Sequence, residues 1–218
     1  VMLSAREINP NQLPSSSQTF VNRRLKYTHG YGAVMTPVNS FQANGLPNFL
    51  LKDIPPVPTS KDLQVDRPEV YFGESTDEHV YVKTTQQEFN FTSDTGTVYS
   101  DYAGKSGVGV GSLFRRFVYS TEYDGLKLLL SGYFTEDSQL LIHRQVRERV
   151  NKVAPFLTFE NDPYLVLLDG RLKWVVDAYT TSDKYPYSEA HQLWEGEGVR
   201  YVRNSVKAVV DAYDGDVK

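Results

Sequence analysis

The segment Tyr164-Leu165-Val166-Leu167-Leu168-Asp169-Gly170-Arg171-Leu172-Lys173-Trp174-Val175-Val176 decides the fold of this chain. Two apolar runs stand on either side of Asp169-Gly170, a dipeptide that favours the two positive φ angles of a type I′ turn. Runs of this length, rich in valine and leucine and bounded by turn residues, are typical of strands. The segment therefore predicts a tight antiparallel hairpin.

A second segment is nearly identical to the return strand of this hairpin. Residues 172–179 read LKWVVDAY and residues 206–213 read VKAVVDAY, so six of the eight positions match. A single pair of this kind does not make a repeat array. Asp214-Gly215 then predicts another hairpin turn whose return strand would begin at Val217, and we expect the natural chain to continue beyond Lys218.

The rest of the chain contains strand-like and helix-like segments. Five short segments between clusters of Pro, Gly, Asn and Asp predict strands, at residues 33–36, 49–54, 69–72, 80–84 and 97–100. The capping residues Thr19, Ser112 and Thr135 precede three predicted helices, at residues 20–27, from residue 113 to a break near Asp124-Gly125, and at residues 136–154. The predicted fold class is α+β, with a mixed, mainly antiparallel sheet, hairpins and two to four packed helices.

The composition favours a globular protein with neither a nucleic-acid partner nor a metal centre. Apolar residues make up 40% of the 218 residues, which suffices for a substantial core, and we expect residues 1–218 to form a single globular domain. A net charge of -4 lacks the basic footprint that binding to phosphates requires. The absence of cysteine excludes disulfides and thiolate metal sites, and the four histidines lack metal-ligand spacing. No cofactor is expected.

Four residues are candidates for catalysis. Asp177 and Asp211 occupy matching positions in the two similar strands. If these strands were neighbours in register, both carboxylates and Glu74 could face one cleft, which is the geometry that moves carboxyl pKa values apart for acid–base chemistry. The alternative is that each aspartate hydrogen-bonds a turn at the end of its strand. His29 lies where the first predicted helix ends, and it either caps that helix or acts as a general base.

Tyrosine-rich segments are candidates for ligand binding. Tyr179, Tyr185 and Tyr187 lie on or beside the loop 182–188. A tyrosine has an apolar body and a polar tip, which suits the recognition of a peptide or a glycan, although core packing at the base of the loop remains an alternative. Four further residues complete the candidate ligand-binding set, namely Tyr27, Tyr31, Arg203 and Asn204.

Basic residues are concentrated on the third predicted helix. They are Arg144, Arg147, Arg149 and Lys152. A face of this kind is either solvated or lies between subunits, and the alternative is contact with anionic lipid headgroups.

Several phrases distributed over nearly the whole chain resemble one protein family. They include Lys52-Asp53-Ile54-Pro55-Pro56, Arg67-Pro68-Glu69-Val70-Tyr71-Phe72-Gly73-Glu74, Asp177-Ala178-Tyr179-Thr180-Thr181-Ser182-Asp183 and Arg203-Asn204-Ser205-Val206-Lys207. In these phrases the chain is similar to UPF0182, an uncharacterised family of bacterial multi-pass membrane proteins. The resemblance implies N-terminal transmembrane helices followed by a large domain on the extracytoplasmic face of the bacterial cell membrane, of which this chain would be the first section. It implies no catalytic residues.

Three functions are expected from this reading, in order of preference. The first is a non-catalytic extracytoplasmic domain that contacts its own transmembrane region, a second copy in a homo-oligomer, or an envelope glycan, lipid headgroup or peptide. The second is a cell-envelope hydrolase that uses the paired carboxylates. The third is an accessory domain of a pore or transporter, and it follows only from the membrane helices that the resemblance implies.

Overall fold

The predicted hairpin is confirmed and forms the middle of the largest sheet. The structure is a computed structural model that describes residues 1–193 and 198–218. Strand β13 (Tyr164–Leu168) pairs antiparallel with the first half of β14 (Arg171–Ser182). The φ angles of Asp169 (51°) and Gly170 (71°) are both positive, as a type I′ turn requires.

Strand β14 is the centre of this four-stranded sheet because it is long enough to hold three partners. β12 (Thr158–Phe159) follows β13 along one edge, and β17 (Tyr201–Asp211) pairs with the other edge from Lys173↔Asp211 to Ser182↔Tyr201. The two similar segments found in the sequence are therefore antiparallel neighbours. The turn expected at Asp214-Gly215 is also present, since Val217 pairs with Val210.

Two smaller sheets and a hairpin surround this centre. One sheet has the order β1 (Met2–Ala5), β3 (Ala33–Thr36), β4 (Leu51–Lys52) and β5 (Val57–Pro58). A second has the order β10 (Val108–Gly109), β11 (Gln139–Leu141) and β7 (Val80–Val82). β8 (Glu88–Ser93) and β9 (Gly96–Ser100) form the hairpin. Two further strand pairs are β2 (Gly30–Tyr31) with β6 (Glu69–Val70), and β15 (His191–Gln192) with β16 (Gly198–Val199).

Helices are short and lie between the strands. They are α1 (Leu113–Ser120), α2 (Leu126–Leu130), α3 (Val146–Val153), the π-helix η3 (Asn22–Lys26), and the 3-10 turns η1 (Pro10–Gln12), η2 (Ser15–Ser17) and η4 (Lys61–Leu63). Two predicted caps are confirmed, because Asn22 N donates to Thr19 Oγ1 at 3.2 Å and Arg115 N donates to Ser112 Oγ at 3.3 Å. The α+β class with a mainly antiparallel sheet is confirmed as well.

The prediction of one long helix over residues 136–154 is wrong in its first half. Residues 139–141 form β11, which is hydrogen-bonded between β10 and β7. Leu140 and Leu141 are both buried, and a helix would place them about 100° apart around its axis, whereas here they fill opposite faces of a strand. Helix α3 begins only after Gln145, whose side chain caps it by accepting a hydrogen bond of 2.6 Å from Glu148 N.

Two apolar cores hold these elements together. The larger one lies around Phe72 and Trp174, beneath the β14 sheet and beside α3. The indole N–H inside it is paired, because Trp174 Nε1 donates to the Phe72 carbonyl at 3.0 Å. The smaller core packs η3 against β7, β10, β11 and α2, with these buried members: Leu25, Tyr81, Val110, Leu128, Phe134 and Leu140.

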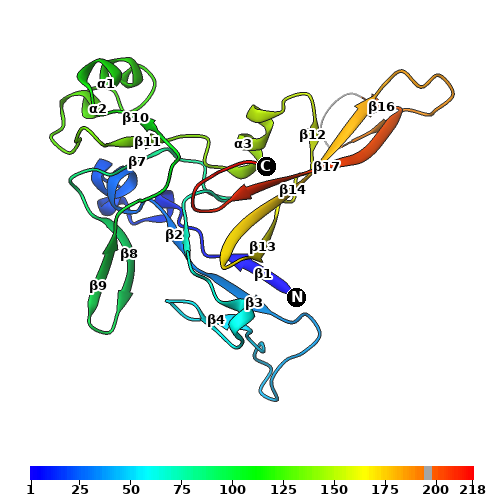
Figure 1. Ribbon diagram of the computed structural model, residues 1–218, viewed down its shortest axis with the longest axis horizontal. Helices are drawn as coiled ribbons and strands as arrows, with labels where there is room; N and C mark the ends of the chain where they lie inside the picture. Colours follow the sequence, from blue (N-terminus) through cyan, green and yellow to red (C-terminus); the bar gives the residue numbers. More distant parts are fainter. Residues whose placement is uncertain (194–197) are drawn as a thin grey trace.

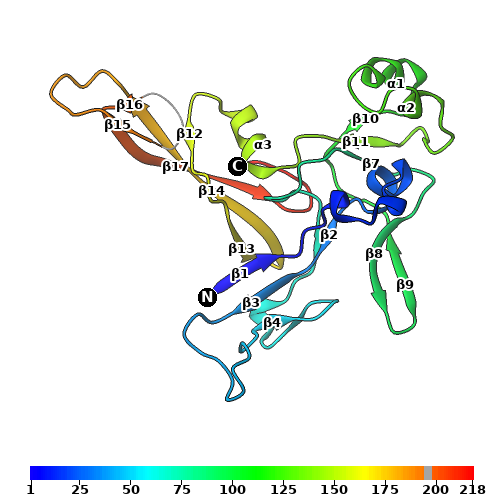
Figure 2. The same ribbon diagram turned by 180° about the vertical axis from the view of Figure 1, so that it is seen from behind.

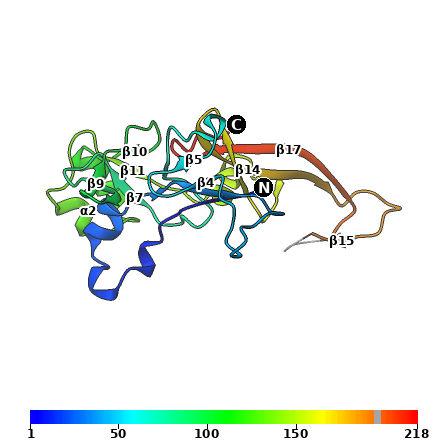
Figure 3. The ribbon, with the colours of Figure 1, turned by 90° about the horizontal axis from the view of Figure 1, so that it is seen from below.

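The molecule is elongated, with a different element at each end of its long axis. Figure 1 and its reverse view in Figure 2 place α1 and α2 at one end and a two-stranded ribbon of β14 and β17 at the other. The view from below in Figure 3 shows the same two ends on opposite sides of the molecule. The β-sheets that pack around the two cores lie between these ends.

Candidate binding surfaces

Asp177 and Asp211, two of the predicted catalytic residues, do not face one cleft. Their strands are neighbours but antiparallel, so Asp177 lies opposite Lys207 and Asp211 lies opposite Lys173. The two aspartates are therefore four residues apart along the ladder, which corresponds to roughly 13 Å. Each is also bound to a cation, because Asp177 forms an ion pair with Lys207 and Asp211 forms one with Arg171 at 2.8 Å.

The hydrogen bonds of the two aspartates are structural. Asp211 accepts from Tyr213 N at 3.0 Å and from Asp214 N at 2.9 Å, which shapes the turn at the end of its strand. Asp211 therefore follows the second interpretation of its sequence position, a hydrogen-bonded turn at the end of a strand. Asp177 accepts from Lys207 and from Asn204 Nδ2 at 3.3 Å, and the hydrogen bond from Lys207 holds the pKa of Asp177 below its usual value. The carboxylate of Asp177 is therefore stabilised in its charged form.

Glu74 belongs to a different cluster. Its backbone N–H donates to Glu7 Oε1 at 3.0 Å, and the other oxygen of Glu7 accepts from Ser75 N at 2.9 Å and from Thr76 Oγ1 at 2.6 Å. Partial burial raises the pKa of Glu74, and the charges of Glu7 and Asp162 raise it further. Glu7 thus fixes the loop after β6 to the N-terminal segment, and a role for Glu7 had no signal in the sequence.

His29 is buried in a network of hydrogen bonds. The residue is 2% exposed, and its Nδ1 lies 2.9 Å from Thr28 Oγ1 while its Nε2 lies 3.3 Å from Asn90 Oδ1. The ring stacks on Tyr71 with a centroid separation of 4.5 Å. Beside it lies Glu88, 1% exposed, which accepts from Tyr71 OH at 2.8 Å and Tyr102 N at 3.0 Å. A substrate in solvent cannot reach this histidine as it is placed here.

Tyr27 and Tyr31 pack on the β8 strand and lie apart from the other candidate tyrosines. Tyr27 contacts Phe89 edge-on at 5.3 Å between ring centroids, and Tyr31 contacts Phe91 at 4.9 Å. Burial raises the pKa of Tyr31, and the charge of Glu69 raises it further. These two tyrosines stabilise the contact between β2 and the β8–β9 hairpin.

The remaining five candidate ligand-binding residues come together at one place. We call this place the arm, defined as residues 179–182 of β14, residues 201–206 of β17 and the loop residues 183–188. It carries Tyr179, Tyr185, Tyr187, Arg203 and Asn204. Tyr185 stacks on Tyr201 with 4.8 Å between ring centroids and 9° between ring planes. Tyr179 OH is turned back to the sheet, where it donates to Glu160 Oε2 at 2.9 Å.

The arm is exposed on both of its faces. Every residue from Val202 to Lys207 is exposed, although a strand with one buried face would alternate. Val202 and Val206 are 41% and 39% exposed, and Tyr187 is fully exposed. In the part of the chain that the structure describes, β17 has no strand beside residues 201–208 other than β14.

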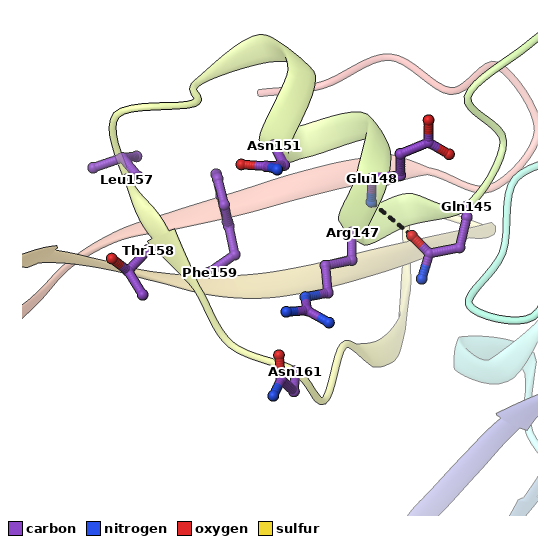
Figure 4. A pocket seen from close by; sticks show the side chains of 8 residues that line it. All are labelled: Gln145, Arg147, Glu148, Asn151, Leu157, Thr158, Phe159 and Asn161. Atoms are coloured by element: carbon purple, nitrogen blue, oxygen red, sulfur yellow. Dashed lines mark hydrogen bonds between the residues drawn. The ribbon is translucent and has the colours of Figure 1, made fainter. Parts of the chain in front are cut away.

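An open bowl lies between α3 and the segment of β12. Its volume is about 550 Å³. Figure 4 shows the Arg147 side chain projecting from α3 toward the loop that carries Asn161. The lining is mostly polar and consists of Gln145, Arg147, Glu148, Asn151, Leu157, Thr158, Phe159 and Asn161. Such a surface offers several hydrogen-bonding side chains, while its one aromatic residue, Phe159, is 7% exposed and belongs to the larger core.

The predicted cationic helix face is reduced to Arg147 and Lys152. Arg144 precedes α3 and is 2% exposed, with its guanidinium donating to the carbonyls of Tyr71 at 2.7 Å and Glu78 at 2.9 Å. Burial lowers the pKa of Arg144 to about 10. Arg149 lies 4.5 Å above the Phe72 ring and donates to the Gly215 carbonyl at 2.6 Å. Both of these arginines hydrogen-bond backbone carbonyls and so link segments that are distant in the chain.

The described residues, 1–193 and 198–218, contain neither a cluster suited to a metal ion nor a helix able to span a membrane. Within them, no three His, Asp or Glu side chains lie together in a way that could hold a metal ion. No helix within them has the length and apolar character needed to cross a membrane.

The structure is that of an α+β protein with two candidate binding surfaces, the arm and the open bowl. A family model with the description "Uncharacterised protein family" and the name UPF0182 matches residues 1–218, and the chain belongs to this family. UPF0182 proteins of Trichodesmium erythraeum, Methanospirillum hungatei and Pelotomaculum thermopropionicum are 46%, 48% and 50% identical to it over its whole length. The chain covers 25%, 24% and 23% of these three relatives, so it spans about a quarter of their length. No solved structure matches it.

Proposed function

We propose that this chain is a non-catalytic extracytoplasmic domain of a membrane protein, and that its arm joins two copies in a homodimer. The proposed membrane location rests on the resemblance to multi-pass membrane proteins noted in the sequence. The proposed dimer rests on one observation, which is the exposure of the arm on both faces. An isolated two-stranded ribbon is marginally stable in water, so a ribbon of this kind favours a partner that covers it.

The free edge of β17 supplies the means of pairing. Unpaired N–H and C=O groups along an edge strand can add a strand from another chain, and a two-fold axis would bring the same edge from a second copy. Val202 and Val206 would then be covered by the partner. The stacked pair of Tyr185 and Tyr201 offers a flat aromatic surface at the tip, of the kind enriched at protein interfaces.

Sedimentation velocity over a range of concentrations tests this proposal. We expect the 218-residue chain to form dimers, and we expect Val202→Lys/Val206→Lys to be monomeric because two buried cations would face each other. The matched control is Val38→Lys/Val57→Lys, which adds the same charge at side chains that are 69% and 51% exposed outside the arm. A wild-type chain that stays monomeric at every concentration would contradict the proposal, as would a control variant that dissociates equally.

The bowl beside α3 favours a second candidate, recognition of an envelope glycan. Arg147 reaches into it, and among the described residues no carboxylate forms an ion pair with this arginine. The hydrogen-bonding groups of Gln145, Asn151 and Asn161 around this bowl suit the hydroxyls of a carbohydrate. Binding of peptidoglycan fragments measured by calorimetry tests this candidate, with loss expected for Arg147→Ala/Asn151→Ala and none for Lys152→Ala. Equal heats from all three chains would reject it.

The carboxylate hydrolase is not proposed. Asp177 and Asp211 do not converge, and His29 is enclosed in the core. The accessory role in a pore or transporter remains a prediction, and the sedimentation experiment bears on it because such a domain must self-associate around an opening.

A further inference from the structure

Helix α1 carries its apolar side chains on the side that faces solvent. At 3.6 residues per turn, Leu113, Phe117, Phe114 and Val118 fall in this order within one arc of about 140°. Their exposed fractions are 69%, 60%, 75% and 47%, and no residue of α1 is buried. A helix of a soluble protein normally turns such a stripe toward the core.

This orientation is fixed by the opposite side of α1, where Arg116 and Tyr119 are turned toward the body. The Arg116 guanidinium donates to the carbonyls of Val110 at 3.0 Å, Gly111 at 2.9 Å and Phe134 at 3.3 Å. The same group lies 5.3 Å from the centroid of the Phe134 ring. Rotating α1 to bury its apolar stripe would remove these hydrogen bonds.

Helix α2 adds to the same end of the molecule. Leu128 is fully buried and anchors α2 in the smaller core, while Leu126 and Leu130, one turn apart, are 70% and 73% exposed. Figures 1 and 3 show that α1 and α2 lie together at the end of the long axis opposite the arm. We call the following six side chains the apolar hairpin surface: Leu113, Phe114, Phe117, Val118, Leu126 and Leu130.

Two cations flank this surface and indicate what covers it. Arg115 and Lys127 are exposed, and within the described part of the chain neither forms an ion pair with a carboxylate. Lys127 Nζ instead lies 5.7 Å from the Phe20 ring centroid. Helices that lie in a membrane interface and contact anionic lipids typically carry leucine and phenylalanine on one face, flanked by lysine and arginine.

We propose that the apolar hairpin surface docks on the interface of an anionic lipid bilayer. Helices of eight and five residues are far shorter than the roughly 20 residues that span a bilayer, so they would lie in its plane. The six side chains would enter the boundary between headgroups and acyl chains, and Arg115 and Lys127 would remain among the phosphates. This inference does not depend on the arm or on dimer formation.

A site-specific probe tests the depth of insertion. The chain has no cysteine, so Phe114→Cys can be labelled at a single position with an environment-sensitive fluorophore. Mixed with phosphatidylcholine vesicles that contain about one third phosphatidylglycerol, this variant should give a blue-shifted emission that brominated acyl chains quench. Phe156→Cys is the matched control, because Phe156 is 83% exposed outside the hairpin surface, and its emission should not change.

Vesicle co-sedimentation tests the affinity with unlabelled chains. We expect Phe114→Ser/Phe117→Ser to bind at least tenfold more weakly than the wild type, Phe156→Ser to bind as the wild type does, and Arg115→Gln/Lys127→Gln to lose the preference for anionic vesicles. Circular dichroism checks that each variant is folded. The proposal is overturned if the wild type does not bind vesicles or if the serine variant binds equally. A third outcome also overturns the proposal: the wild type does not bind lipid but self-associates, and the serine variant is monomeric. A second copy of the chain would then cover the surface.

Discussion

At the scale of single residues, Glu88 is the carboxylate on which the interior depends most. It is 1% exposed and accepts hydrogen bonds from Thr28 Oγ1, Tyr71 OH and Tyr102 N. Burial raises the pKa of Tyr71 well above its ordinary value, and the neighbouring charge of Glu88 raises it further, so Tyr71 stays a hydrogen-bond donor. The three buried donors therefore all depend on the carboxylate of Glu88 as their acceptor.

We predict that Glu88→Ala lowers the free energy of unfolding by about 3 kcal/mol or more, because three buried donors lose their acceptor. Glu88→Gln should cost less, since its amide oxygen still accepts. Urea denaturation measures both, with the exposed Glu122→Ala as a control near zero. A loss for Glu88→Ala no larger than that of the control would show that the network contributes nothing.

Asp124 gives a prediction about pH. Burial alone would raise the pKa of Asp124, but hydrogen bonds from His79 at 2.7 Å and Tyr81 at 3.0 Å, with the charge of Arg24, outweigh burial and hold this pKa below its usual value. A depressed folded-state pKa means that the stabilisation is present above the usual carboxyl pKa of about 4 and is lost as pH falls through the folded-state value.

Asp124→Asn should therefore destabilise the chain by about 1–3 kcal/mol near neutral pH, and the difference from wild type should shrink in acid. Denaturant unfolding at several pH values from neutral to about 3 measures this. Asp94→Asn, at an exposed position in the β8–β9 turn, should show no such trend. A difference that stays constant with pH would contradict the assigned role.

At the scale of elements, Gly111 connects β10 to the α1–α2 hairpin. A Cβ atom at Gly111 would lie 2.0 Å from the Glu136 carbonyl oxygen, and backbone cannot move aside easily. Gly111→Ala should destabilise the chain by about 1–3 kcal/mol and increase hydrogen exchange in α1 and α2. Gly132→Ala is the matched control, because nothing lies within 4 Å of its added Cβ. Equal exchange in both variants would show that this contact does not hold the hairpin.

The elements also show where sequence patterns fail. The β13–β14 hairpin was predictable because Asp169-Gly170 fixes its turn locally. Residues 139–141 were misread as helix, because only the pairing with β7 and β10 makes them a strand. Leu140-Leu141 alone has no helical or strand period, so tertiary hydrogen bonds decided between the two.

The candidate site residues also differ in how far the sequence could place them. Five of the proposed ligand-binding residues lie on one arm because β14 pairs with β17, a pairing that the sequence offered only as a condition. Convergence of the carboxylates was one of two alternatives, suggested by the similarity of their strands, but similarity does not fix the direction of pairing. Antiparallel pairing puts Lys207 opposite Asp177 and Lys173 opposite Asp211. Glu88 and Glu7 were missed because their partners are distant in the chain.

At the scale of the whole molecule, the two exposed ends should act independently. They lie at opposite ends of the long axis and share no residue (Figure 1), and effects at distant sites usually add. We predict that Phe114→Ser/Phe117→Ser leaves the dimerisation constant unchanged, and that Val202→Lys/Val206→Lys leaves vesicle binding unchanged at concentrations where the wild type is monomeric. Sedimentation and vesicle binding of both variants measure this, and a crossed effect would show that the ends are coupled.

The sequence by itself determined the β13–β14 hairpin, the turn at Asp214-Gly215, two of the three predicted helix caps and the α+β class, because turn residues and capping side chains act over a few neighbouring positions. Only the tertiary structure decided that the similar strands run antiparallel, that His29 is enclosed and that the apolar side of α1 faces outward. These outcomes depend on contacts between residues far apart in the chain, such as Arg116 with the Phe134 carbonyl and His29 with Asn90. No local pattern encodes such contacts.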